Sequence, residues 1–197
     1  MKSDALIFVA AGLLAGIAAW KAADASVDAG EYEPSGVDSI SDVIDDFTFD
    51  NFGISIMSNW RDDLAGRGAA YAPLLAAAEV RHGIPGGMLA RLAWQESRFR
   101  ADIISGRTVS SAGALGIMQI VPKWHPGVDP LNPAAAINYA GGYLASLYRQ
   151  FSRWDLALKA YNWGPGNVRA WLNGQKVEPT ETRLYSAQIL NDMGAIA

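Results

Sequence analysis

One acidic residue, Glu96, has the type and the position expected of a general acid. Between Gly86 and Phe99, apolar residues and this glutamate repeat at the spacing of one helix face, so its carboxyl group should lie against the protein interior. The residues on that face are Leu89, Leu92, Ala93 and Glu96. Burial disfavours a charged carboxylate and raises its pKa, so Glu96 could hold a proton near neutral pH and donate it. The alternative is a glutamate at a helix end that turns to solvent or pairs with Arg98 or Arg100.

Two later segments carry polar groups that could bind a sugar. The run from Ser110 to Pro122 is rich in small residues, which would let a flat ligand lie against the main chain, and its Gln119 could hydrogen-bond hydroxyl and acetamido groups. In the run from 160 to 166, the Tyr161 hydroxyl could point at the acid and Trp163 could stack on a sugar face. Each segment could equally be a turn with ordinary core packing.

The elements that must position these groups are predicted to be helices. One helix is expected over residues 71–82, ended by Gly83, and a second after Pro85. A long helix should begin at Asn132 and Pro133. Two more are expected around 155–161 and over 181–193, with Gly- and Pro-rich turns between the helices. The apolar face of the long helix comprises Ile137, Ala140, Gly141, Leu144, Leu147, Tyr148 and Phe151. The small residues at 140–142 would let another helix approach closely. No strand pattern of convincing length is found, so the fold class is mainly α.

Length and composition indicate one catalytic-sized domain plus a tail. The chain has 197 residues, of which 50% are hydrophobic. It has no cysteine, which excludes a disulfide, a thiolate metal site and a cysteine nucleophile, and its two histidines, His82 and His125, lie far apart in sequence. No Gly-x-Ser-x-Gly elbow and no cluster of metal-ligating residues is found, so no cofactor and no metal are expected.

Charge is segregated along the chain. Residues 22–63 hold 11 acidic residues and one base, whereas residues 64–197 hold 8 acidic and 13 basic residues, a net of +5. Such a basic domain could suit an anionic polymer such as nucleic acid or a carboxylate-rich cell wall. Because the bases are scattered singly and no nucleic-acid-binding motif is found, no specific nucleic-acid partner is expected.

The first sixty residues divide into two zones. Residues 1–21 contain an uncharged apolar run, Ala5 to Trp20, which is shorter than the ~20 residues that span a bilayer and has the length of a signal-peptide core. We expect a membrane-active or assembly helix covered by lipid, a partner helix or copies of itself, with a cleaved signal as the alternative. Residues 22–60 form an acidic linker, but the stretch from Val43 to Ile54 is too apolar for pure disorder and should dock on a partner.

Read together, four ordered motifs resemble the catalytic domain of the soluble lytic transglycosylases over roughly residues 67–193. The motifs are Glu96-Ser97-x-Phe99, Ser110-x-x-Gly113-Ala114-x-Gly116-x-Met118-Gln119, Ala160-Tyr161-Asn162-x-Gly164-Pro165-Gly166 and Glu181-Thr182-Arg183-x-Tyr185. The resemblance implies a lysozyme-like domain over residues 61–197 that cleaves the β-1,4 bond between N-acetylmuramic acid and N-acetylglucosamine in peptidoglycan glycan strands. It departs from the family in a longer stretch between Glu96 and Ser110 and in Trp163, where a small residue is usual.

The same resemblance implies residue roles. Glu96 would be the single acid and base. The positions that line the groove or support the acid would be Ser110, Met118, Gln119, Tyr161, Asn162, Glu181 and Tyr185. Glu96 would protonate the glycosidic oxygen with help from the substrate N-acetyl group, then take a proton from the 6-hydroxyl to close a 1,6-anhydro ring. Tyr161 would help to hold the acid, while Gln119 and Asn162 would position substrate oxygens.

Three other functions stay open. A goose-type lysozyme-like hydrolase would need a second acidic group near the cleft, for which Asp102 and Asp129 are the candidates. A wall-binding module without catalysis and a structural virion or envelope component are the others. The apolar segment would suit a bacteriophage virion protein delivered to the periplasm, or an enzyme anchored in the membrane and facing the periplasm, with other virion or envelope proteins as partners.

Overall fold

The domain is built from helices. The computed structural model describes residues 59–194, so the predicted segment 1–21 and all but the last two residues of the predicted segment 22–60 lie outside the described residues. Its helices are α3 (Trp60–Ala65), α4 (Ala72–His82), α5 (Met88–Ser97), α6 (Ala101–Ile104), α7 (Pro133–Phe151), α8 (Trp154–Trp163), α9 (Pro165–Leu172) and α10 (Thr180–Asp192). The β pairing found in this part of the chain is a single bridge between Leu115 and Ile120, so the mainly α prediction is confirmed. None of the helices described is long and apolar enough to cross a membrane.

Two predicted helix boundaries are confirmed by their capping geometry. Gly83 ends α4 in the left-handed conformation, with φ of 67°, and its N–H group donates hydrogen bonds to the Glu79 and Val80 carbonyls. Asn132 begins α7, where its side chain accepts a hydrogen bond of 3.1 Å from the N–H of Ala135. These caps depend on local residue types, which explains why the sequence reveals them.

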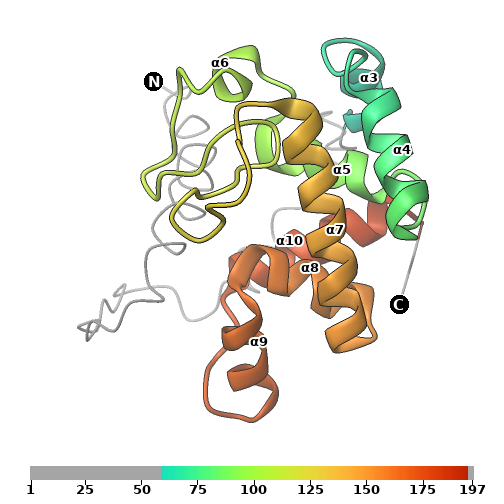
Figure 1. The fold of residues 1–197 in the computed structure, drawn as a ribbon. Helices are drawn as coiled ribbons and strands as arrows, with labels where there is room; N and C mark the ends of the chain where they lie inside the picture. The colour runs from blue at the N-terminus through green and yellow to red at the C-terminus, as the bar shows by residue number, and fades with distance from the viewer. Residues whose placement is uncertain (1–58, 195–197) are drawn as a thin grey trace, which may run out of the picture.

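Three short helices, α3, α6 and α9, were not predicted as separate elements, although α3 and α6 lie in the zone from about Asn59 to Gly106 whose pattern is helical. Helix α9 begins at Pro165, in a segment that the sequence analysis interpreted as a sharp turn. Proline is well suited to the first helical position, but eight residues hold too few turns to display a helical period. Figure 1 shows α9, in orange, at the lower end of the domain, far from α3 and α4 at the upper right.

Helix α5 lies at the centre of the core. All ten of its residues are buried, and it packs against α3, α4 and α10. Its N-terminus is capped from α4 by Glu79, whose carboxylate accepts hydrogen bonds from the N–H groups of Gly87, Leu89 and Ala90 at 2.8, 2.8 and 3.1 Å. The helix that carries Glu96 is therefore fixed on several sides.

Helix α7 packs between α4 and α8, and its apolar face is largely as predicted. Five of the seven predicted residues are buried, whereas Phe151 is half-buried and Tyr148 is exposed. At Gly141, an added Cβ would lie 2.9 Å from the ring of His82 in α4. The small residue thus permits the close helix approach that the sequence predicted.

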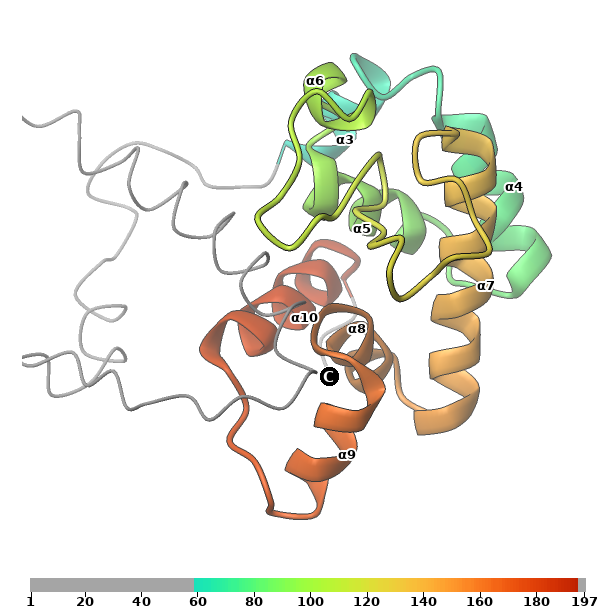
Figure 2. The ribbon, with the colours of Figure 1, turned by 60° about the vertical axis from the view of Figure 1, so that its left-hand side comes forward.

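A long loop joins α6 to α7 and carries Gln119. Leu115 and Ile120 exchange two backbone hydrogen bonds of 3.0 Å across a tight turn in which Gly116 and Gln119 have φ of 72° and 46°. A Cβ on Gly116 would collide with the Pro130 carbonyl oxygen, so the loop closes on itself at this glycine. Figure 2 shows the loop, in yellow-green and yellow, beside α5 and α7.

Candidate active site

Glu96 lies inside the protein, in the last turn of α5. The residue is 4% exposed, and its Oε1 accepts a hydrogen bond of 2.5 Å from the hydroxyl of Tyr185 on α10. The alternative of a glutamate turned to solvent is wrong. Arg98 places its guanidinium 3.4 Å from the centre of the Trp94 ring, and Arg100 pairs with Asp102.

Two tyrosine hydroxyls lie within the electrostatic reach of Glu96. Burial, followed by the nearby Glu96 carboxyl group, raises the pKa of both Tyr185 and Tyr161 well above the usual value. Both hydroxyls therefore stay protonated and act as donors near neutral pH. Tyr185 donates to Glu96, whereas Tyr161 donates to the Met118 carbonyl at 3.1 Å.

Tyr185, rather than Tyr161, donates the hydrogen bond to Glu96 Oε1, and the expectation that Tyr161 helps to hold the acid stays a prediction. Tyr185 reaches Glu96 because α10 packs directly on α5. Tyr161 lies on α8, where its hydroxyl ties the helix to the loop that carries Gln119. The two tyrosines thus have separate partners, which the sequence motifs could not distinguish.

A pocket of about 230 Å³ has Tyr161 in its wall. Its lining residues are Gln119, Ile120, Val121, Trp124, His125, Tyr139, Ala140, Tyr143, Ala160, Tyr161, Trp163, Gly164 and Pro165. Gln119 and Tyr161 therefore meet in one site, and Trp163 joins them. Aromatic faces with a few amide and hydroxyl groups are suited to a sugar ring, whose faces are apolar and whose edges are polar.

Glu96 is not itself a lining residue of this pocket. Its carboxyl group contributes to the raised pKa of Tyr161, which does line the pocket. Glu96 is shielded from bulk water.

Part of the pocket wall was not predicted from the sequence. His125 Nδ1 lies 2.8 Å from the Tyr139 hydroxyl, and its ring contacts the Tyr139 and Tyr143 rings at centroid distances of 5.5 and 5.1 Å. Tyr143 in turn contacts the ring of Tyr161 at 5.9 Å. Tyr139 and Tyr143 are four residues apart on α7, a spacing that indicates a shared helix face and could have identified them. His125 comes from a loop, where no period exists.

Gln119 and Met118 occupy the turn beside the pocket. Gln119 is 7% exposed, and its Nε2 donates to the Gly116 carbonyl at 3.0 Å, which holds the side chain in place. Met118 is fully buried and does not line this pocket, but its carbonyl accepts the Tyr161 hydrogen bond. Gln119 is therefore placed to contact a ligand, while Met118 supports the wall.

The other three predicted residues do not line the pocket. Ser110 Oγ accepts a hydrogen bond of 2.8 Å from the Ala114 N–H and so braces the loop. Asn162 is 2% exposed, and its Oδ1 accepts a hydrogen bond of 2.9 Å from Thr182, which joins α8 to α10. Glu181 is half-buried in the first turn of α10. Site roles for these residues stay predictions.

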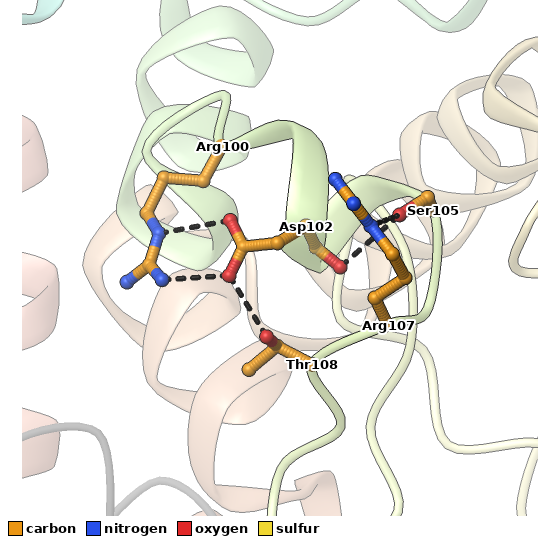
Figure 3. Close-up of polar contacts among 5 residues, drawn as sticks. All are labelled: Arg100, Asp102, Ser105, Arg107 and Thr108. Carbon is orange, nitrogen blue, oxygen red and sulfur yellow. Dashed lines mark hydrogen bonds and ion pairs between the residues drawn. The ribbon is translucent and has the colours of Figure 1, made fainter.

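The two candidates for a second acidic group are engaged elsewhere. Asp102 accepts hydrogen bonds from both Arg100 nitrogens at 3.2 and 2.7 Å and from the Thr108 hydroxyl at 2.8 Å, as Figure 3 shows. The Arg100 and Thr108 hydrogen bonds lower the pKa of Asp102 to about 2. Asp129 accepts a hydrogen bond of 2.9 Å from the Leu131 N–H within its own turn. Both carboxylates stabilise the turns in which they lie.

The extra length between Glu96 and Ser110 is accounted for by this same structure. The segment forms α6 and a turn closed by the Asp102 network, in which Arg107 Nε also donates to Ser105 Oγ at 3.3 Å (Figure 3). Because the turn is closed on itself, the added residues leave Ser110 in its bracing position.

Comparison with known proteins gives a consistent result. The soluble lytic murein transglycosylase of Escherichia coli (strain K12) is 31% identical over 132 residues, which cover 54% of this chain and 20% of that protein. The protein of the same name from Salmonella typhimurium is 31% identical over 106 residues, which cover 41% of this chain and 16% of that protein. The chain thus spans about a fifth or less of the length of these relatives.

A solved structure shows the same fold. It is an inactive mutant of the lytic transglycosylase Slt from Pseudomonas aeruginosa, with a TM-score of 0.52 and 24% identity, and the match covers 68% of this chain and 25% of that one. The predicted lysozyme-like transglycosylase fold is therefore confirmed. The sequence model of the family described as the Transglycosylase SLT domain matches residues 73–184, more than half of the chain. The chain therefore belongs to the transglycosylase SLT domain family.

Proposed function

We propose that this domain is a peptidoglycan lytic transglycosylase. It cleaves the β-1,4 bond between N-acetylmuramic acid and N-acetylglucosamine without water and leaves 1,6-anhydromuramic acid ends. The observation that carries the proposal is a buried glutamate that accepts a hydrogen bond from Tyr185 and influences Tyr161, which lines an aromatic pocket together with Gln119. The names of the relatives, which are murein transglycosylases, agree with this reaction.

The surroundings of Glu96 suit a group that must both give and take a proton. Burial and the negative end of the α5 dipole favour the uncharged acid, because Glu96 is the penultimate residue of the helix. The hydrogen bond from Tyr185 favours the carboxylate. These opposing effects let one side chain act first as acid and then as base.

The pocket provides groups for an N-acetylated sugar. The Trp124, Tyr143 and Trp163 rings offer apolar surface for a sugar face, and the Gln119 amide can pair with an acetamido group. Trp163 is 4% exposed and occupies a place where the family usually has a small residue. We therefore expect a tighter fit at this end of the site than in relatives.

The reaction then needs one protein carboxyl group. Glu96 protonates the glycosidic oxygen while the N-acetyl group of the substrate stabilises the developing positive charge. The ionised Glu96 next removes the proton of the muramic acid 6-hydroxyl, whose oxygen attacks the anomeric carbon and closes the anhydro ring. No water enters the product, and Glu96 ends the cycle protonated.

The goose-type hydrolase is the alternative, because its fold class is the same. It needs a positioned water and a second acidic group. Among the residues that line the described pocket none is acidic, and Asp102 and Asp129 each hold a loop turn. These observations favour transglycosylation over hydrolysis.

The test is mass spectrometry of muropeptides released from purified sacculi. The wild-type chain should release anhydro products, which are one water lighter than hydrolysis products. Glu96→Gln keeps the shape and removes the transferable proton, so release should fall by a factor of about 10²–10⁴. Asp102→Asn should keep most of the activity, since Asp102 serves the loop. Full activity in Glu96→Gln, or hydrated products that require Asp102, would refute the assignment.

We also propose that the domain acts in the periplasm, brought there by a bacteriophage particle or anchored in an envelope assembly. The support is the apolar run in residues 1–21 and the acidic segment that follows, which suit attachment to a membrane or to another protein. Detection of the protein in purified phage particles supports the first setting. Detection solely in bacterial envelopes supports the second.

A further inference from the structure

Arg91 is a buried cation in the helix that carries Glu96. The residue is 1% exposed, although arginine is among the residues least often fully buried. Its Nε donates to Asp192 Oδ2 at 2.5 Å, and its Nη1 donates to Gln95 Oε1 at 2.8 Å. Its guanidinium also lies 4.6 Å from the centre of the Trp94 ring. Such a group is retained inside a core only when its charge is balanced.

The ion pair joins the same two helices as the catalytic hydrogen bond. Arg91 and Glu96 are on α5, while Asp192 and Tyr185 are on α10. Arg91 precedes Glu96 by five residues, a rise of about 7.5 Å along the helix. Helices α5 and α10 are therefore fastened at two neighbouring points, one of which is the contact between the acid and its hydrogen-bond donor.

We propose that Arg91 and Asp192 are positioning residues for the acid, because their ion pair between α5 and α10 fixes the charge beside the hydrogen bond that joins Tyr185 to Glu96. The proposal rests on the proposed function only in treating Glu96 as the acid. It assigns a task to two residues outside the motifs that the chain shares with its family. Neither residue lines the pocket.

The charges around Tyr185 support this link. The positive charge of Arg91 lowers the pKa of Tyr185, against the larger effects of burial and of Glu96, and Tyr161 on α8 adds to the increase. Asp192 balances Arg91. Directly after α5, the cation of Arg98 feels the charges of Arg91, of Asp63 in α3 and of Asp192. The field at the Tyr185 and Glu96 pair therefore depends on whether Arg91 is neutralised.

Two single variants should act in opposite directions. Asp192→Asn leaves the Arg91 cation without its carboxylate, which favours ionised Glu96 and moves its titration to lower pH. Arg91→Met removes the cation and leaves the Asp192 charge, which moves the titration to higher pH. A unit charge at about this helical separation, in the effective dielectric constant of about 20 that suits protein sites, should cause a displacement of roughly one to two pH units in each case. The double variant should return close to the wild-type midpoint.

The experiment uses two readouts on the full chain. The first is the pH dependence of kcat/KM on purified sacculi. The second is the carbon-13 resonance of the Tyr185 Cζ atom, assigned with Tyr185→Phe, whose change with pH reports the ionisation of Glu96 without any turnover. If the wild type shows no turnover but the resonance midpoints move as stated, the proposed function fails and the positioning role stands.

A structural role alone gives a different pattern. It would lower kcat in both single variants and leave both midpoints at the wild-type value, or it would move both midpoints in the same direction. Either result overturns the proposal. Arg91→Lys keeps a cation at this position, so this variant should have the same midpoint as the wild type. Asp155→Asn is the matched control, because Asp155 pairs with Arg153 at the exposed start of α8 and should leave both readouts unchanged.

Discussion

Removal of the Tyr185 hydroxyl tests how the acid is controlled. Tyr185→Phe deletes one oxygen atom and keeps the ring, which is 2% exposed and packed in the core. The deleted hydroxyl donates the 2.5 Å hydrogen bond to Glu96. The variant therefore changes the partner of the carboxyl group without changing the helices that place it.

The size of the effect follows from this bond. A hydrogen bond to a charged acceptor contributes about 1.5–3 kcal/mol, against about 0.5–1.5 kcal/mol for a neutral one. Its loss thus destabilises the ionised form of Glu96 by roughly 1–1.5 kcal/mol more than the protonated form. This difference corresponds to a shift of the Glu96 titration midpoint by about one pH unit. Because the carboxylate is the form that loses support, Glu96 keeps its proton to higher pH.

The assay is the pH profile of kcat/KM on purified sacculi. The falling limb, where the acid loses its proton, should move upward by about one unit, and the melting temperature should drop by several degrees because a buried acceptor loses its donor. Tyr148→Phe is the control, since Tyr148 is an exposed residue at the far end of α7. A falling limb that stays in place or moves downward in Tyr185→Phe would show that this hydroxyl does not govern the acid.

Two further predictions concern the supports of the site. Gly116→Ala should destabilise the domain by more than about 2 kcal/mol in urea unfolding, because the new Cβ meets the Pro130 carbonyl as well as a φ of 72°. Gly113→Ala has a similar φ of 76° but open space around it, so it should cost about 1 kcal/mol, and equal losses would contradict the role given to Pro130. Glu79→Ala should lower the melting temperature because three N–H groups at the start of α5 lose their acceptor, and the intact protein should be more stable than the variant by about 2 kcal/mol or more. An unchanged melting temperature would mean that water replaces the carboxylate at this helix end.

Much of the fold could be predicted because its signals are local. The spacing of apolar residues around Glu96 and along α7 shows which face each helix buries, and Gly83 and Asn132 mark helix ends through their own conformations. Helix α9 could not be predicted in this way, because one Pro-Gly pair is compatible with a turn and with a helix start.

The contacts between site residues were harder to predict from the sequence. Tyr161 and Tyr185 both belong to family motifs, yet the choice of Tyr185 as the donor to Glu96 depends on how α10 crosses α5. His125 and Tyr139 come together from a loop and a helix, through a contact that has no sequence period.

The sequence by itself indicated Glu96 as the candidate acid, the helical class and the family motifs, because each depends on residue type and short-range spacing. Only the tertiary structure decided that Tyr185 donates a hydrogen bond to Glu96 and that Arg91 forms an ion pair with Asp192. It also decided that Asp102 accepts hydrogen bonds within its own loop. Each of those contacts depends on a hydrogen bond or a charge whose strength changes steeply with distance and burial. Residues 101 positions apart in the chain, such as Arg91 and Asp192, acquire that distance only when the helices pack.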